Sequence, residues 1–326
     1  MQINGTLGYY LKSEIFPQVA QPPFGNIDAE RLSHQRPVFL YKEACGQAKV
    51  VGKYYKYDSI DLEEAWHKAE KEYNNLVLLR DQIGMKNNHY NIIAPLGRNK
   101  VLSALLILEN GNGKNLDHYI AQAIFANQTQ DLYSRLSELA RFFVRLHRNS
   151  DSGRQVSGNL PQWYLKTLME TLRSSLPGFG YQEGELNWLA GDWWNRRETY
   201  SDHEVLVHGD ATPTNFLFHH QRVTGIDLEK MKWADRCWDL GFIATELKHH
   251  FLWRTGDGSR AEPYIGHFLW EYAVAYGDTR LFYSITRRLP LYMTFGFLRI
   301  ARNNWLDVKY RYKLIGEAKL CLKFKP

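Results

Sequence analysis

The hydrophobic pattern of this chain changes character about a third of the way along it. Residues 38–43 and 48–55 are rich in Val, Phe and Tyr, as β-strands are, and a glycine supplies a turn at residues 45–47 between them. Apolar residues then recur at steps of three and four, the spacing of one helical face, at Leu62, Trp66, Ala69, Tyr73 and Leu76. Beyond residue 113 helical spacing dominates. The order predicts an α+β protein with a strand-rich first part and a mainly helical second part.

Strong turn formers mark the boundary between these two parts. A buried-strand candidate at residues 101–109 runs directly into Asn-Gly-Asn-Gly at 110–113. We therefore expect an N-terminal lobe of residues 1–108 with one long helix, a hinge of residues 109–113, and a helical lobe of residues 114–326.

Prolines give further local expectations. Residues 1–37 contain four prolines and are expected to be irregular, with one strand. From Gly241 to the end we expect helices that are interrupted at Pro263 and Pro290.

Composition limits the class of protein. Of the 326 residues, 44% are hydrophobic and 23% charged, which is typical of a packed globular protein. The apolar runs are shorter than the roughly 20 residues of a membrane-spanning helix, and the start lacks a signal-peptide pattern. The three cysteines (Cys45, Cys237 and Cys321) are scattered, so we expect no disulfide framework and a reducing cytoplasm as the compartment.

The formal net charge is +6 and the C-terminal tail is basic and aromatic. A solvated amphipathic helix explains this tail, and nucleic acid is not expected as a partner; a weak contact with an anionic surface is the alternative. The histidine pairs at 219–220 and 249–250 are not expected to bind metal, because adjacent side chains diverge on a strand or a helix.

The candidate catalytic residues lie in the segment from residue 205 to 229, VLVHGDATPTNFLFHHQRVTGIDLE. It contains Asp210, an amide five positions later at Asn215, and Asp227 after a short hairpin. Transfer of a phosphoryl group from ATP needs a carboxylate that orients the attacking hydroxyl and oxygen ligands for Mg²⁺. Carboxylate and amide oxygens are ligands that Mg²⁺ accepts. The order and spacing therefore predict Asp210 as catalytic base, with Asn215 and Asp227 as metal ligands.

This segment resembles the aminoglycoside phosphotransferase / choline kinase family, whose members are small-molecule relatives of protein kinases. The matching motifs are His208-Gly209-Asp210 with Asn215, then Ile226-Asp227-Leu228-Glu229, then Asp239-Leu240-Gly241. Leu228 departs from the usual aromatic residue. The resemblance implies a bilobal protein-kinase-like fold, His208 and Asp239 as supports of the catalytic loop, and Glu229 near a second metal ion.

The resemblance also implies a phosphate-binding lysine in the first lobe. Val50-Val51-Gly52-Lys53 is similar to the family's lysine strand, and Lys56 is the alternative. A helix glutamate should hold the lysine. Glu70 and Glu72 both flank the apolar face at similar angles; the run that starts at Glu72 resembles the family's helix more closely. A glycine-rich phosphate loop is not visible in the sequence.

The adenine site is expected at the hinge, through backbone groups of Leu108, Glu109 and Gly111. Together these features predict an enzyme that uses ATP and Mg²⁺ and phosphorylates a hydroxyl of a small molecule. The basic second half favours a neutral or anionic, sugar-like acceptor over a cationic aminoglycoside- or choline-type one.

Two other functions remain open at this point. A nucleotide-binding pseudokinase would explain the missing glycine-rich loop, although its usual loss of a catalytic carboxylate is not seen. A protein Ser/Thr kinase is disfavoured because the chain lacks an Ala-Pro-Glu segment and has only a short interval between Asp227 and Asp239.

Overall fold

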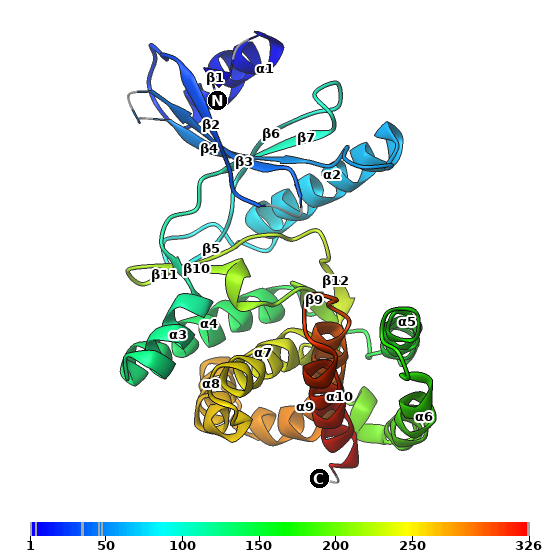
Figure 1. Cartoon of the computed structure of the whole chain (residues 1–326). Coiled ribbons are helices and arrows are strands. Elements are labelled where there is room, and N and C mark those ends of the chain that lie inside the picture. The colour runs from blue at the N-terminus through cyan, green and yellow to red at the C-terminus, as the bar shows by residue number, and fades with distance from the viewer. Residues whose placement is uncertain (1, 4, 34–35, 45, 47, 325–326) are drawn as a thin grey trace. The chain divides into compact units, whose positions relative to one another are not determined.

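The computed structural model describes residues 2–3, 5–33, 36–44, 46 and 48–324. Its contacts divide the chain into two compact units (Figure 1). Unit 1 comprises residues 1–113 and 217–229, and unit 2 comprises residues 114–216 and 230–326. The first boundary falls at the end of the expected hinge. The segment 217–229, which we expected within the helical lobe, belongs to unit 1.

A six-stranded sheet forms the centre of unit 1, and its neighbouring strands run antiparallel to one another. In sheet order its strands are β1 (Gln2–Ile3), β2 (Ile27–Arg31), β3 (Val38–Glu43), β4 (Lys49–Tyr54), β7 (Leu105–Glu109) and β6 (Pro95–Asn99). Alternate residues of β4 point to opposite faces. Val50 therefore faces one side of the sheet, and Lys53 faces the other.

The N-terminal segment covers the face of the sheet that carries Val50. It contains α1 (Gly5–Tyr10), the π-helical turn η1 (Leu11–Ile15) and the 3₁₀ turn η2 (Phe16–Gln18). Leu11 and Phe16 are fully buried in one apolar cluster with Val50. The expectation that residues 1–37 are irregular with one strand was wrong, because apolar residues of this segment pack on the sheet and stabilise helical turns.

Helix α2 (Leu62–Val77) is the long helix expected in the first part. The side chain of Asp61 caps it by accepting hydrogen bonds from the backbone N–H groups of Glu63 and Glu64. The helix packs against β6 and β7 and continues into η3 (Leu78–Gln82). Its buried positions are Ala65, Ala69, Glu72 and Leu76, so the one charged residue among them needs a partner.

The strand expected at 101–109 begins only at Leu105, because Ser103 and Ala104 adopt the left-handed conformation (φ 58° and 51°) in the turn before β7. Pro290 does not interrupt its helix: it lies inside α9, where burial of the following apolar residues outweighs a proline cost of about 3 kcal/mol. Of the turn expected at 45–47, only Gly46 is among the described residues.

A second sheet holds segment 217–229 in unit 1. β11 (Arg222–Gly225) runs parallel to β5 (Tyr90–Ile92), with Val223 opposite Tyr90, and β10 (Phe216–His219) lies on its other side. Asp227 follows two residues after β11, so this pairing fixes where Asp227 enters unit 1.

Unit 2 is built from helices around a buried apolar core. They are α3 (Leu116–Phe125), α4 (Thr129–Asn149), α5 (Asn159–Ser175), α6 (Gly180–Trp194), α7 (Cys237–Thr255), α8 (Glu262–Tyr276), α9 (Arg280–Ala301) and α10 (Val308–Lys323). Short 3₁₀ turns lie at η4 (Arg197–Tyr200), η5 (Pro213–Asn215) and η6 (Gly258–Ala261). The antiparallel strands β9 (Val205–Val207) and β12 (Lys232–Ala234) flank the catalytic-loop candidate, and β8 (Lys114–Asn115) precedes α3.

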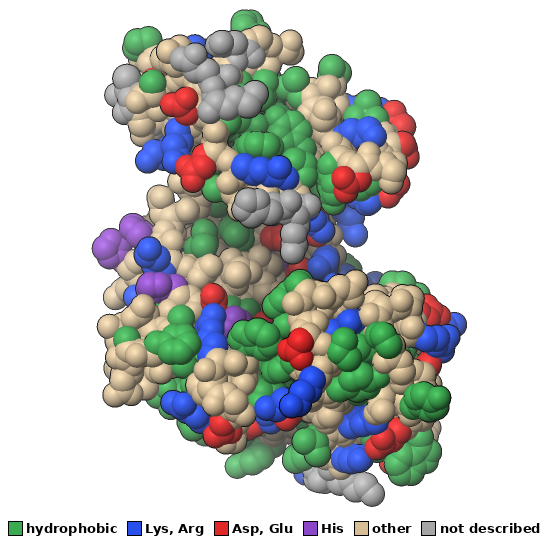
Figure 2. Space-filling model, viewed as in Figure 1, with side chains coloured by type: hydrophobic (Ala, Val, Ile, Leu, Met, Phe, Trp, Pro, Cys, Tyr) green, Lys and Arg blue, Asp and Glu red, His purple; other side chains and the backbone are tan. Residues whose placement is uncertain are grey.

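The basic tail forms α10, which packs on α9 and α6. Leu314, Ile315 and Leu322 are buried, and Lys319 and Lys323 lie 2.5 and 3.0 Å from carboxylate oxygens of Glu185. On the face seen in Figure 2, basic side chains are interspersed with acidic ones. Within the described part of the chain, no helix has the length and apolar character that crossing a membrane requires.

Candidate active site

Lys53 forms the centre of the site in unit 1. Its Nζ donates to both carboxylate oxygens of Glu72, at 2.9 and 2.8 Å, and to Oδ1 of Asp227 at 2.7 Å. Burial alone would lower the pKa of Lys53, but the two carboxylates raise it above its ordinary value, so the ammonium group stays charged. Glu72 is fully buried and also accepts a hydrogen bond from the hydroxyl of Tyr55.

The alternatives left open by the sequence are placed elsewhere. Glu70 forms an ion pair with Arg98 at 3.3 Å, and Nζ of Lys56 donates to the backbone carbonyl of Ile60. The geometry therefore associates Lys53 with Glu72, as the resemblance implied.

Asp227 has an unusual backbone conformation, with φ at 64° in the left-handed region. Such a conformation persists where the surrounding structure imposes it, and it is often found at functional positions. Leu228, which replaces the family's aromatic residue, is fully buried, and its carbonyl accepts from the side-chain amide of Asn75 at 2.9 Å.

Glu229 extends this acidic group. It pairs with Arg36 at 2.7 Å, and ligand oxygens of Glu72, Asp227 and Glu229 lie within 4.8 Å of one another. Hard oxygen donors of this kind suit Mg²⁺, so the donor set fits the implied ion. Arg36 lies between β2 and β3, and β3 is followed by β4, the strand that carries Lys53.

The hinge candidates lie at and beyond the end of β7. Leu108 is buried opposite Val51, while Oε2 of Glu109 accepts a hydrogen bond from the backbone N–H of Ala94 at 3.4 Å. Gly111 leaves no room for a side chain, because a Cβ there would lie 2.4 Å from Cδ1 of Leu217.

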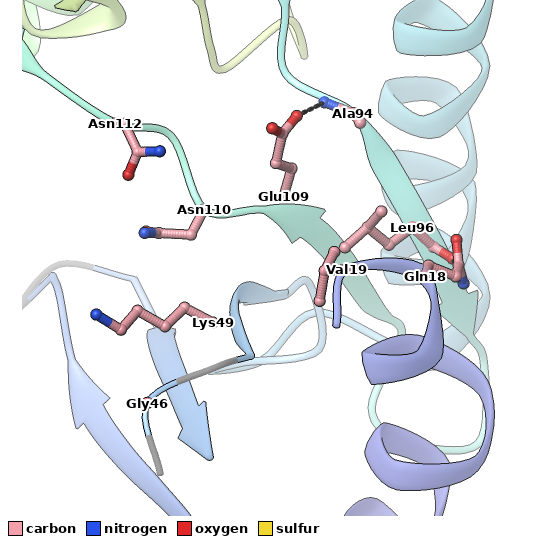
Figure 3. Close-up of a pocket in the computed structure, with 9 residues that line it drawn as sticks. All are labelled: Gln18, Val19, Gly46, Lys49, Ala94, Leu96, Glu109, Asn110 and Asn112. Carbon is pink, nitrogen blue, oxygen red and sulfur yellow. Dashed lines mark hydrogen bonds between the residues drawn. The ribbon is translucent and has the colours of Figure 1, made fainter. Parts of the chain in front are cut away.

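A polar pocket of about 450 Å³ lies beside this hinge segment (Figure 3). It is lined by Gln18, Val19, Gly46, Lys49, Ala94, Leu96, Glu109, Asn110 and Asn112. Three polar side chains of the expected hinge segment, Glu109, Asn110 and Asn112, therefore line this pocket. Lys53, Glu72 and Asp227 are not among the residues that line this pocket.

In unit 2, Asp239 holds the catalytic-loop candidate. Its Oδ2 accepts from the backbone N–H of His208 at 2.7 Å, and its Oδ1 accepts from the N–H of Gly209 at 3.0 Å. Nε2 of His147 lies 3.2 Å from the same Oδ2 of Asp239. Burial lowers the pKa of His147, so the neutral ring donates to the carboxylate. Asp239 is fully buried.

Gly209 is required by the course of the backbone. It has φ at 79°, and a Cβ would lie 2.1 Å from the carbonyl oxygen of Lys230. Asn215, at the end of η5, donates its side-chain amide to the carbonyl of Asp210 at 2.9 Å. This bond uses the amide nitrogen of Asn215, so the metal-ligand role expected from the sequence would fall to its side-chain oxygen.

The carboxylate of Asp210 lies between two cations. Nζ of Lys230 is 2.7 Å from Oδ2, and the guanidinium of Arg299 contacts Oδ1. Arg299 also pairs with Glu246 at 2.5 Å. Burial alone would raise the pKa of Asp210, but Arg299 and Lys230 hold it below its ordinary value.

Sequence reasoning missed both partners of Asp210. Arg299 is a charged residue within the apolar stretch from Leu289 to Ala301, which is the signal that could have identified it as a buried ion-pair partner. Lys230 gave no such signal, because a lysine after a hairpin is usually solvated.

Three comparisons with known proteins bear on this site. The model of the phosphotransferase enzyme family (APH) matches residues 98–280, more than half of the chain, and the chain therefore belongs to this family. It is accordingly a kinase, a phosphotransferase with an alcohol group as acceptor. A search of the curated proteins found no significant match.

Solved structures of low sequence identity share the fold. ADP-bound aminoglycoside phosphotransferase APH(2'')-Ib has a TM-score of 0.62 and 13% identity, covering 99% of this chain and 100% of that one. The streptomycin–ATP complex of APH(2'')-IIa has a TM-score of 0.61 and 13% identity, and the match covers 99% of this chain and 100% of that one. Plasmodium vivax ethanolamine kinase has a TM-score of 0.58 and 14% identity, and the match covers 91% of this chain and 80% of that one. The fold is thus α+β and protein-kinase-like.

Proposed function

We propose that this kinase transfers the γ-phosphate of ATP, with Mg²⁺, to a hydroxyl of a small, neutral or anionic, sugar-like molecule. The observation that carries the proposal is the bonding of Lys53 to Glu72 and Asp227. A lysine held by a helix glutamate is positioned for phosphate oxygens in enzymes that transfer phosphoryl groups.

Asn215 and Asp227 are the proposed metal ligands, and Glu229 lies close enough to Asp227 to support a second ion. When bound, Mg²⁺ supplies positive charge that stabilises the phosphate oxygens during transfer. Lys53 binds the α- and β-phosphates in this scheme, and the backbone of Leu108, Glu109 and Gly111 binds adenine. Relatives of this fold have been crystallised with ADP and with ATP, which supports a nucleotide site.

Asp210 is the proposed base. Its lowered pKa keeps it ionised at neutral pH, so it can orient the acceptor hydroxyl and accept its proton. Asp239 and His208 hold the loop that carries it. The proteins that share this fold include an aminoglycoside phosphotransferase in complex with streptomycin, a macrolide 2'-phosphotransferase and an ethanolamine kinase, so a cationic acceptor is the second candidate.

Nucleotide binding with and without Mg²⁺ tests this assignment. Calorimetric titration with ATP should give binding that Mg²⁺ strengthens in the wild type. Asp227→Asn should lose the Mg²⁺-dependent part, because the metal loses a charged ligand. Asp192→Asn, an exposed change on α6, is the control and should bind as the wild type does.

Two results would reject the proposal. Binding of ATP that Mg²⁺ does not affect would remove Asp227 from the metal site. Tight MgATP binding with no phosphate transfer to any alcohol, sugar or aminoglycoside would instead favour the nucleotide-binding pseudokinase.

A further inference from the structure

The charges around Asp210 define the class of acceptor more narrowly than the proposed function does. We propose that the acceptor carries an oxyanion, a phosphate or a carboxylate, close to its reacting hydroxyl, and that Lys230 binds this oxyanion. The inference rests on the proposed transfer reaction and on contacts within unit 2.

Lys230 is placed beside the base by the backbone. Lys232 pairs with Val207 in the antiparallel ladder of β12 and β9, so Lys230, two residues earlier, comes opposite Gly209. The close approach of Gly209 to the Lys230 carbonyl shows the same adjacency. The side chain of Lys230 is 41% exposed, so its ammonium group can turn from Asp210 to a ligand.

The carboxylates near the base are already neutralised. Asp210 and Glu246 share the guanidinium of Arg299, whose side chain is 10% exposed, and Glu246 also lies 3.7 Å from His250. Lys232, two residues after Lys230, is a further cation of this segment, and its Nζ lies 3.6 Å from the ring centre of Trp238. A cationic acceptor would meet like charges here, whereas an oxyanion meets lysine ammonium groups.

The ion pair also restricts the base until the acceptor arrives. Lys230 occupies Oδ2 of Asp210, and Arg299 occupies Oδ1. An oxyanion that draws Lys230 away opens Oδ2 to the acceptor hydroxyl. The hydroxyl oxygen then bonds to the γ-phosphorus and its proton passes to Asp210, while the bond from the γ-phosphorus to the bridging oxygen breaks and ADP leaves with that electron pair.

Matched acceptors test the proposal. Glycerol with glycerol 3-phosphate, and glucose with glucose 6-phosphate, differ by one phosphate; choline and kanamycin supply cations. For the wild type with MgATP, kcat/KM should favour the anionic member of at least one pair by about ten-fold or more. Lys230→Met should remove this preference by slowing the anionic acceptor, while the neutral acceptor is not slowed because Oδ2 of Asp210 is then open to its hydroxyl. Lys309→Met, at an exposed position of α10, should keep it.

Inorganic phosphate gives a second readout that needs no turnover. Calorimetry should show that phosphate binds the wild type with a dissociation constant at least about five-fold lower than that for Lys230→Met. Circular dichroism checks that the variant is folded.

The outcomes separate this inference from the proposed function. An equal loss for neutral and anionic acceptors would assign Lys230 to the transferred phosphoryl group and overturn the inference. So would a preference for choline or kanamycin, or phosphate binding that is unchanged in Lys230→Met. Failure to bind MgATP would instead reject the proposed function itself.

Discussion

The carboxylate of Asp239 fixes the loop that carries the proposed base, and its replacement by asparagine gives a change whose cost can be worked out. Asp239 accepts three hydrogen bonds, two at Oδ2 and one at Oδ1, with no exposure to water. Asparagine offers one acceptor oxygen. The less costly orientation keeps that oxygen toward His208 and His147 and turns the amide NH₂ toward the N–H of Gly209.

This orientation loses one bond to a charged acceptor, about 1.5–3 kcal/mol, and leaves a buried donor unsatisfied, about 1–3 kcal/mol. We therefore expect Asp239→Asn to lower the free energy of unfolding of unit 2 by about 3–5 kcal/mol. Because all tryptophans except Trp66 lie in unit 2, urea unfolding followed by tryptophan fluorescence reports on this unit. Hydrogen exchange should show faster exchange at the His208 and Gly209 amides.

The exposed Asp192→Asn change is a matched control and should shift stability by less than about 0.5 kcal/mol. A loss below about 1.5 kcal/mol for Asp239→Asn, with unchanged exchange at the two amides, would refute the reasoning. In that case the loop would be held by contacts other than this carboxylate.

Three further predictions follow from the same geometry. Gly209→Ala brings Cβ against the carbonyl of Lys230, so the loop should lose at least about 2 kcal/mol of protection in hydrogen exchange; wild-type protection would contradict this. Glu72→Gln leaves the buried Lys53 with Asp227 as its remaining carboxylate partner, so the β4 amides should lose about 3 kcal/mol of protection against hydrogen exchange. Unchanged protection of these amides would contradict the pairing. The pKa of Asp210 is lower in the folded protein than in the unfolded chain, so its ion pairs stabilise the fold above the unfolded-state pKa, and this stabilisation is lost as the pH falls through the folded-state pKa. The carboxylate therefore stays ionised between about pH 5 and 8, and the pH profile of kcat/KM should show no loss of activity from its protonation in that range. A loss of that kind would contradict the ion pairs.

The sequence was most informative where local spacing determines structure. The helical periodicity before residue 77 and the strand compositions of β3 and β4 predicted those elements close to their observed bounds. The segment from His208 to Asp239 was recognisable because the chemistry requires fixed residue types at fixed intervals.

What the sequence did not predict depends on contacts between distant segments. The helical turns before residue 18 owe their stability to packing on the sheet, and their own sequence gives little signal. Helix α9 continues through Pro290 because the apolar residues that follow it are buried. Arg299 reaches Asp210 from 89 residues further along the chain, a separation that periodicity cannot resolve.

The central claim is that the carboxylate of Asp210 is needed for transfer but not for nucleotide binding. Phosphorus NMR of Asp210→Asn with MgATP and the best acceptor, beside calorimetric titration with MgATP, tests both halves of this claim. We predict MgATP binding within about three-fold of the wild type and a rate of acceptor phosphorylation lower by at least about 100-fold. Undiminished formation of phosphorylated acceptor by this variant would contradict the account.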